Sequence, residues 1–328
     1  HKGVNFPGID LGITAFTGQD RAFLAFAAEE ELDAVSQSFV QDEHDILAVR
    51  KAAAELDYNP MILAKIERAG ALVHIDRILE VCDGIMVARG DLGVETPIEE
   101  IPTVQKRLIE QANRMAKPVI TATQMLESMT QYRRPTRAEV TDVAKAILDG
   151  TDCVMLAGET AIGAHPVETV SVMASIAHAT ETANAGRFGL GYSLLTEAQH
   201  DGVDPNSRFG FSVYRLAEGM DVSIVFVPSF SGETARRIAR YRLPIWVVAI
   251  TRDQRTCRRL VFTYGVYSLT IAETHLPQDP THWRDYVLSW MEANEVPGTT
   301  VLLVEGPGTL GVTDSRRIDI IDLPESAR

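Results

Sequence analysis

Residues 84–93 read Gly-Ile-Met-Val-Ala-Arg-Gly-Asp-Leu-Gly, and this stretch decides the fold class. Five small or apolar residues predict a strand, a charged Arg89-Gly90-Asp91 turn follows at once, and the next residues can open a helix. The pattern holds a carboxylate beside free backbone N–H groups at the carboxyl end of a strand. Open α/β sheets and (β/α)8 barrels place ligands and metals at such positions. The stretch therefore predicts an α/β domain with a site at that end of its sheet.

Similar units repeat on both sides of this stretch, from about residue 20 to about residue 181. Strands buried on both faces, each followed by a helix, are typical of a parallel sheet with helical crossovers. We expect about five such βα units. Short apolar runs predict their strands at 34–39, 61–67, 84–89, 119–123 and 153–157. Amphipathic stretches predict helices at about 19–31, 43–56, 71–81, 98–115, 137–148 and 166–184.

A second domain is predicted after a polar, glycine-containing stretch at 186–206, which is typical of a linker. The first domain is then 1–185, and the second is a smaller α/β domain over 207–328 with a mostly parallel sheet of about five strands. Its last strand follows a short connection, so we expect it to be antiparallel. The expected strands lie at about 222–227, 245–250, 266–270, 300–304 and 317–321. The expected helices lie at about 208–219, 232–241, 253–261 and 280–293.

The composition is that of a globular chain of 328 residues, 45% hydrophobic and 23% charged. A net charge of −14 argues against a nucleic-acid partner, which would favour a basic face. No apolar run approaches the length of a membrane span. The three cysteines lie in or beside apolar segments without metal-ligand spacing, which favours free thiols in a reducing cytoplasm.

Polar side chains end several consecutive strands of the first domain. Lys65 and Glu67 are two apart, so they share a face, and they form either a structural ion pair or an active-site pair. Glu67 with Asp91 fits a hard cation such as Mg²⁺, because two carboxylates leave room for water and substrate oxygens. Thr123 closes the next strand, and Glu159 follows the strand after it. The pattern predicts a single site at one end of the sheet.

Several long motifs, in order along the chain, resemble pyruvate kinase. The resemblance covers nearly the whole chain, is dense from 61 to 170 and thins after 205. The motifs that carry it are Lys2–Gly8, Ala64–Glu67, Ile85–Gly93, Ala122–Met129, Arg134–Glu139, Asp142–Ala144, Leu148–Gly150 and Gly158–Ala161.

The resemblance implies a role for each group at the strand ends. Lys65 would neutralise the transferring phosphoryl group and the enolate oxygen. Glu67 and Asp91 would hold Mg²⁺ or Mn²⁺. The segment Ala88–Asp91, through its backbone N–H groups at Gly90 and Asp91, would bind the substrate carboxylate together with the Thr123 hydroxyl. A helix start independently favours an anion.

The resemblance also implies an activity, an oligomeric state and a cellular location. The substrates would be phosphoenolpyruvate and ADP, giving pyruvate and ATP in the last step of glycolysis. The complete protein would be a cytoplasmic homotetramer that also uses K⁺.

The chain departs from the family in the number of barrel strands. The family has a (β/α)8 TIM barrel with a lid domain inserted after its third strand, whereas 1–185 supplies only about five βα units. We expect a partial barrel, lacking the first three strands and the lid, that is inactive alone. In the family those strands supply a phosphate-binding arginine and the K⁺ ligands. Ala157 stands where the family commonly has a serine of the proton relay, so threonine or water substitutes there or proton transfer is impaired.

A possible effector site lies in the second domain, where hydroxyls and a glycine precede a helix. Ser229, Ser231, Gly232 and Thr234 suit a phosphate, and many family members place an allosteric sugar-phosphate site there. The alternative is a simple helix cap at Ser231. Two further readings of the chain stay open: an aldolase or lyase acting on pyruvate enolate at a Mg²⁺ site, and a non-catalytic remnant whose second domain senses metabolites.

Overall fold

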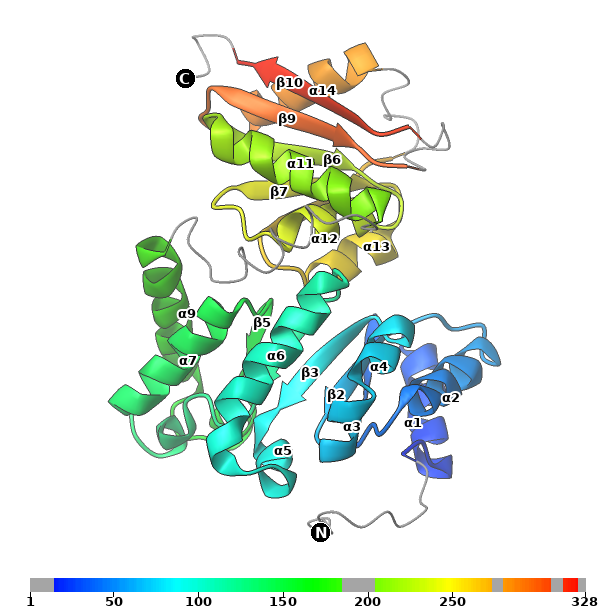
Figure 1. Ribbon diagram of the computed structural model, residues 1–328, viewed down its shortest axis with the longest axis vertical. Helices are drawn as coiled ribbons and strands as arrows, with labels where there is room; N and C mark the ends of the chain where they lie inside the picture. The colour runs from blue at the N-terminus through cyan, green and yellow to red at the C-terminus, as the bar shows by residue number, and fades with distance from the viewer. Residues whose placement is uncertain (1–14, 185–203, 273–279, 308–314, 324–328) are drawn as a thin grey trace. The chain divides into compact units, whose positions relative to one another are not determined.

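The structure is a computed structural model, and it describes residues 15–184, 204–272, 280–307 and 315–323 (Figure 1). The chain divides into two compact units, His1–Asn184 and Ala185–Arg328. Within the described residues no helix is both long enough and apolar enough to cross a bilayer.

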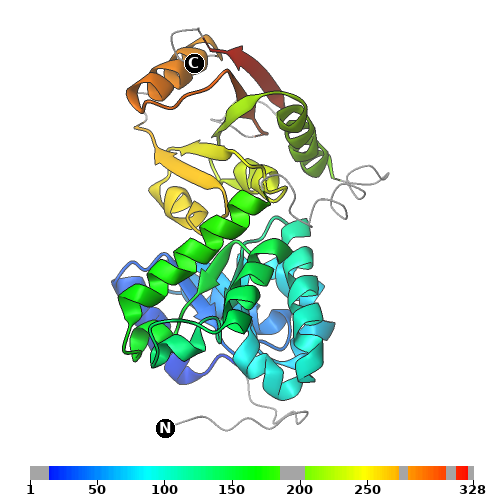
Figure 2. The same ribbon diagram turned by 90° about the vertical axis from the view of Figure 1, so that its left-hand side faces the viewer.

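The first unit is built on five parallel strands that pair in the order in which they occur in the chain. Figure 2 shows the unit from the side, with helices packed along the sheet. The strands are β1 (Ala34–Gln37), β2 (Met61–Ile66), β3 (Gly84–Ala88), β4 (Val119–Ala122) and β5 (Cys153–Met155). Because neighbouring strands are parallel, their carboxyl ends all lie at one edge of the sheet. This confirms the predicted α/β class and the five βα units.

Helices connect these strands, and their starts follow local sequence signals. Thr17 and Thr136 each form a capping box, with Asp20 and Glu139 respectively, and Gly150 ends a helix with a φ of 94°. The longer helices are α1 (Gly18–Glu29), α2 (Glu43–Ala54), α6 (Ile101–Arg114), α7 (Arg137–Asp149) and α9 (Pro166–Ala183). The shorter ones are α3 (Ala69–Val73), α4 (Ile75–Val81), α5 (Arg89–Glu95), η1 (Ile98–Glu100), η2 (Glu127–Thr130) and α8 (Gly158–Ala161).

The two faces of the sheet differ in chemistry. Ile62, Ala64 and Ile66 of β2 belong to the core formed with the helices. Side chains alternate along a strand, so Leu63, Lys65 and then Glu67 lie on the opposite face. The alternation thus directs the charged pair away from the helical layer and toward the carboxyl edge.

The second unit contains a five-stranded sheet in the order β10-β9-β6-β7-β8. Its strands are β6 (Val222–Pro228), β7 (Trp246–Thr251), β8 (Val266–Thr270), β9 (Thr300–Glu305) and β10 (Arg317–Asp322). Only β10 runs antiparallel, against β9, which confirms the expected direction of the last strand. Separate apolar clusters cover the two faces of the sheet. The helices are α11 (Pro205–Gly219), α12 (Glu233–Ala239), α13 (Gln254–Leu260) and α14 (Pro280–Ala293).

The structure differs from the predicted elements at a few boundaries. The predicted helix 71–81 is two helices that meet at His74, whose φ of −105° and ψ of 12° interrupt the helical path. A helix starts directly at Arg89, without an intervening turn. Most of the predicted linker lies outside the described residues, and its last two residues belong to α11.

Candidate active site at the carboxyl edge of the first sheet

Lys65 and Glu67 form an ion pair at the end of β2. The Lys65 Nζ lies 2.6 Å from Glu67 Oε1 and donates a hydrogen bond of 2.8 Å to Ser38 Oγ. The Glu67 side chain is only 1% exposed, whereas that of Lys65 is 24% exposed. A buried carboxylate is costly unless it is paired, so the ammonium and its neighbours hold Glu67 in one position.

The end of β1 supplies the second contact of Glu67. The backbone N–H of Phe39 donates to Glu67 Oε2 at 2.7 Å. Phe39 has a φ of 55°, a left-handed conformation that costs a non-glycine residue about 1–3 kcal/mol. Phe39 is 41% exposed, and the Arg68 guanidinium lies 5.5 Å from the centroid of its ring. Sequence reasoning missed Ser38 and Phe39, because positive φ at a phenylalanine leaves no sequence signal.

Asp91 lies at the end of the neighbouring strand, in the first turn of α5. Ile66 pairs with Val87 in the parallel register, so Glu67 and Ala88 leave their strands at the same level. Ala88 is buried and Gly90 half-buried. The Asp91 carboxylate is exposed and forms no ion pair or hydrogen bond with other described residues. Its carboxylate is therefore available to a ligand, and a ligand shared with Glu67 stays a prediction.

Thr123 closes β4 in direct contact with the segment after β3. Its Oγ1 accepts a hydrogen bond of 2.8 Å from the Gly90 N–H and donates one of 2.7 Å to the Ala122 carbonyl. Thr123 and Gln124 have φ values of 65° and 53°, two consecutive left-handed residues without a glycine. The two groups predicted to bind a substrate carboxylate thus lie against each other, and the strained turn fixes the hydroxyl.

The Arg89 side chain is 7% exposed, and its guanidinium contacts the protein's own main chain. Its Nη2 donates to the carbonyls of Thr123 and Gln124 at 2.7 and 3.1 Å. Its Nη1 lies 2.5 Å from Asp142 Oδ2 of α7. A direct contact between Arg89 and substrate stays a prediction.

Glu159 links the ends of β4 and β5. Its carboxylate is 1% exposed and accepts hydrogen bonds from the backbone N–H groups of Leu126 at 3.1 Å and Ala157 at 2.9 Å. The motif containing Glu159 is visible in the sequence, but its structural role is not, because the contact with Leu126 spans 33 residues. Ala157 offers only its main chain at this edge.

Glu67 and Asp91 have the donor chemistry that a hard divalent cation prefers. Both Glu67 oxygens have a partner, but a carboxylate offers about four lone-pair sites, so each oxygen can accept a second ligand. Exposed Asp91 and buried Glu67 fit a cation bound partly by protein and partly by solvent or substrate. Among the described residues, one group of three clustered candidate ligands occurs, Asp42, Glu43 and His44 at the start of α2. That group is separate from the predicted pair.

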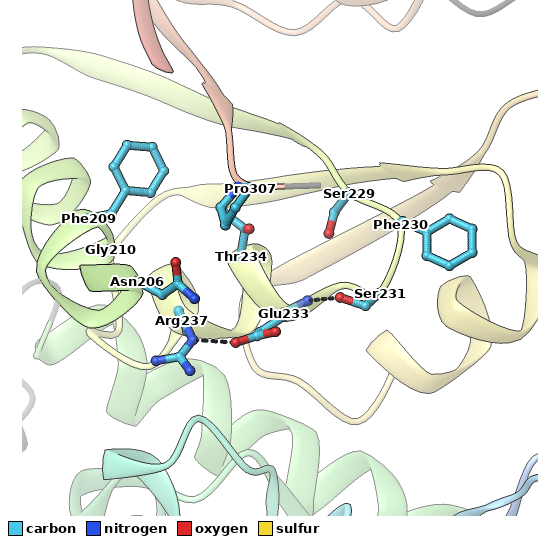
Figure 3. Close-up of a pocket in the computed structure, with 10 residues that line it drawn as sticks. All are labelled: Asn206, Phe209, Gly210, Ser229, Phe230, Ser231, Glu233, Thr234, Arg237 and Pro307. Carbon is cyan, nitrogen blue, oxygen red and sulfur yellow. Dashed lines mark hydrogen bonds and ion pairs between the residues drawn. The ribbon is translucent and has the colours of Figure 1, made fainter. Parts of the chain in front are cut away.

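A cavity of about 190 Å³ in the second unit contains three of the four predicted effector residues (Figure 3). Ser229, Ser231 and Thr234 line it, while Gly232 has a φ of 74° and its N–H donates to Ser229 Oγ at 3.0 Å. Gly232 itself supplies no side-chain cap to α12, but Ser231 Oγ accepts a hydrogen bond of 3.4 Å from the Glu233 N–H, so the helix-cap alternative stays open. The remaining lining residues are Asn206, Phe209, Gly210, Phe230, Glu233, Arg237 and Pro307.

Arg237, which lines this cavity, forms ion pairs with two carboxylates. Arg237 Nε lies 2.8 Å from Glu233, and its Nη1 lies 2.9 Å from Asp204. Partial burial raises the pKa of Asp204, but hydrogen bonds from Ser207 and Asn206 and the Arg237 charge outweigh this and leave the pKa below its usual value. Asp204 is therefore ionised at neutral pH, and an incoming anion would have to compete with both carboxylates for Arg237.

Comparisons with known proteins agree on one family. The model of the family "Pyruvate kinase, barrel domain" matches residues 1–170, and that of "Pyruvate kinase, alpha/beta domain" matches residues 210–318. A pyruvate kinase of Thermococcus litoralis is 46% identical over 283 residues, covering 85% of this chain and 59% of the relative. "Pyruvate kinase 2" of Synechocystis is 39% identical over 324 residues, covering 98% of this chain and 53% of the relative.

A crystal structure described as a pyruvate kinase from Cryptosporidium parvum has the same fold, with a TM-score of 0.86 and 32% sequence identity. The match covers 98% of this chain and 64% of that one. The chain spans about half the length of the curated relatives it matches. Its first unit is accordingly part of a barrel and its second an α/β domain of the same family. With both family models matched in order and the site motifs at one edge of the sheet, the chain belongs to the pyruvate kinase family.

Proposed function

We propose that this chain carries the phosphoryl-transfer half of a pyruvate kinase active site, which transfers a phosphoryl group from phosphoenolpyruvate to ADP. The observation that carries the proposal is the Lys65 ammonium, held 2.6 Å from Glu67 and 2.8 Å from Ser38 at the carboxyl edge. The bond between phosphorus and the enol oxygen breaks, and a terminal oxygen of ADP takes the phosphoryl group. The enolate then gains a proton at its methylene carbon, giving pyruvate.

Charge neutralisation is the main contribution of these residues. Phosphoryl transfer needs positioning and electrostatic stabilisation more than covalent chemistry. Lys65 places a positive charge at the site of a chain whose net charge is −14. Burial of Glu67 and its contacts with Lys65 and Phe39 keep that charge fixed, so little reorganisation is needed during reaction.

Glu67 and Asp91 would hold a divalent cation, Mg²⁺ or Mn²⁺. Such an ion, when bound, polarises phosphoryl and carboxylate oxygens as a Lewis acid. The Thr123 hydroxyl and the Gly90 N–H would orient the substrate carboxylate beside it, once each exchanged its present acceptor, the Ala122 carbonyl and Thr123 Oγ1 respectively, for a carboxylate oxygen. We also propose that a protein as long as these relatives would require K⁺, and this proposal rests on the family resemblance alone.

The test is a chimera in which residues 1–328 replace the matched segment of the Synechocystis relative, whose match covers 98% of this chain. We expect ATP formation from phosphoenolpyruvate and ADP in a coupled assay. A folded chimera without this activity would contradict the proposal. Cleavage of 2-oxo acids with release of pyruvate, in place of ATP formation, would favour the aldolase or lyase alternative.

A second candidate function is effector binding in the cavity of the second unit, supported by its hydroxyl-rich lining. Arg237 would be its cationic contact, and Glu233 would oppose an anion. Glu233→Ala should therefore strengthen binding of a sugar phosphate such as fructose 1,6-bisphosphate, measured by calorimetry on the full chain. Equal affinity in both proteins would show that Glu233 does not oppose the anion. A non-catalytic sensor would retain this binding and lack transfer activity in the chimera.

Two further proposals rest on the family resemblance alone. The complete protein would form a homotetramer, and it would lie in the cytoplasm. Light scattering of the purified chimera checks the first, and fluorescence microscopy of the tagged chain in its host checks the second.

A further inference from the structure

A buried arginine, Arg89, lies beside the residues proposed to bind the substrate carboxylate and contacts the main chain of one of them, Thr123. Arg89 and Gly90 are consecutive, and both contact Thr123. The Gly90 N–H donates to the Thr123 hydroxyl at 2.8 Å, and Arg89 Nη2 donates to the Thr123 carbonyl at 2.7 Å. Arg89 Nε also approaches that carbonyl at 3.3 Å. Two consecutive residues at the start of α5 therefore contact both the hydroxyl and the carbonyl of Thr123.

The turn that Arg89 contacts has an unfavourable backbone conformation. Thr123 and Gln124 both have positive φ, and neither is a glycine. Such conformations persist where surrounding contacts over-determine them. Arg89 Nη2 reaches the Gln124 carbonyl at 3.1 Å as well, so one planar guanidinium satisfies both carbonyls of the strained pair.

Helices α6 and α7 fix the other side of the guanidinium. Asp142 of α7 lies 2.5 Å from Arg89 Nη1, and Gln105 of α6 accepts from the same nitrogen at 3.4 Å. Gln105 donates to Asp149 at 3.1 Å, and Asp149 pairs with Lys145 on α7. A continuous set of contacts thus runs from the two helices through Arg89 to the turn that presents the Thr123 hydroxyl.

We infer that Arg89 and Asp142 form a positioning clasp, in which α7 sets the placement of the Thr123 hydroxyl and through it the affinity for the substrate carboxylate. The inference rests on the proposed function for its effect on ligand binding, but not for the clasp itself. Arg89 touches no reacting atom in this account. It acts through the main chain of Thr123 and Gln124.

The first test measures amide hydrogen exchange of Gly90 in the full 328-residue chain, because this amide donates to the Thr123 hydroxyl. Asp142→Asn should speed Gly90 exchange by about 10- to 100-fold, the scale of a lost hydrogen bond to a charged group, and leave Val87 of β3 unchanged. Asp142→Glu keeps the charge and should recover part of the protection. Arg89→Lys keeps the charge but cannot bridge two carbonyls, so it should resemble Asp142→Asn.

The matched control is Asp83→Asn. Asp83 also pairs with an arginine, Arg50, at 2.9 Å, and its side chain is 34% exposed against 39% for Asp142. It accepts from the Ile62 N–H at the amino ends of the strands, opposite the site. Asp83→Asn should lower the melting temperature without changing Gly90 exchange. Equal Gly90 exchange in wild type and Asp142→Asn, or equal acceleration by Asp83→Asn, would overturn the clasp.

The second test uses oxalate, a planar dianion that resembles the carboxylate and enolate oxygens of enolpyruvate. With Mn²⁺ present, Asp142→Asn should weaken oxalate binding by about 10-fold or more while Mn²⁺ binding alone is unchanged. Unchanged oxalate affinity would contradict the functional role of the clasp. If wild type bound no oxalate with Mn²⁺, the proposed function would fail, and Gly90 exchange would still decide whether the clasp exists.

Discussion

At the residue scale, Lys65, Glu67, Asp91 and Thr123 lie at the carboxyl ends of three neighbouring strands, β2, β3 and β4, and contacts with residues distant in the sequence hold Glu67 and Thr123 in place. Lys65, Glu67, Asp91 and Thr123 could be found because each follows an apolar run and so lies near a carboxyl end. Their supports could not be found. The contacts of Phe39 with Glu67 and of Arg89 with Thr123 join residues 28 and 34 positions apart, and the left-handed φ values that shape them occur at ordinary residue types.

The residue-scale prediction concerns Lys65. In the chimera, Lys65→Met should lower kcat by about 10²- to 10³-fold, because the charge stabilises mainly the transition state, and should change KM little. The control is Lys117→Met, since Lys117 donates to the Cys82 carbonyl at the amino side of the sheet and should leave kcat unchanged. Steady-state kinetics in a coupled assay measures both. A raised KM with near-normal kcat would refute the role given to Lys65.

At the element scale, strand and helix positions were predictable because hydrophobic periodicity and capping residues are local signals. The short helix α5 directly follows β3 at the site edge, α8 begins just after β5, and the break at His74 lies within a periodic pattern. Their boundaries depend on tertiary contacts, such as those of Arg89 and Glu159, and these contacts are not written in the periodicity.

The element-scale prediction concerns Glu139 at the start of α7. It closes a capping box with Thr136 and accepts from both the N–H and the hydroxyl of Ser128, at 2.7 and 2.6 Å. Partial burial raises the pKa of Glu139, but the hydrogen bonds from Ser128 and Thr136 outweigh it and leave the pKa below its usual value. A lowered pKa contributes stability above the unfolded value of about 4.3 and loses it as the pH falls through the folded value.

Glu139→Gln should therefore lower stability at pH 7 by about 0.5–2 kcal/mol, with a smaller difference from wild type at pH 3. Thermal unfolding followed at both pH values measures this. The control is Glu110→Gln, because half-buried Glu110 approaches the exposed Lys106 only at 3.8 Å and this substitution should cost almost nothing. Equal losses at pH 3 and pH 7 would show that the Glu139 charge contributes no stability.

At the scale of the whole molecule, the described first unit has five strands, whereas its relatives are about twice as long as this chain. A five-stranded sheet leaves β1 and β5 as edges within the described residues, and open edges favour association. We expect the 328-residue chain alone to associate and to show no measurable ATP formation, because the resemblance places further phosphate and K⁺ ligands outside it. A preparation free of host enzyme that forms ATP would contradict this.

The central claim is that Glu67 and Asp91 form one metal site at the carboxyl edge, and Mn²⁺ binding to the full chain tests it most directly. Electron paramagnetic resonance, with oxalate present, counts bound Mn²⁺ in wild type and in Glu67→Gln, Asp91→Asn and Asp42→Asn. The account predicts one oxalate-dependent site that either of the first two substitutions removes and that Asp42→Asn, in the separate cluster on α2, leaves intact. Retention of that site in both Glu67→Gln and Asp91→Asn, or its loss in Asp42→Asn alone, would contradict the account.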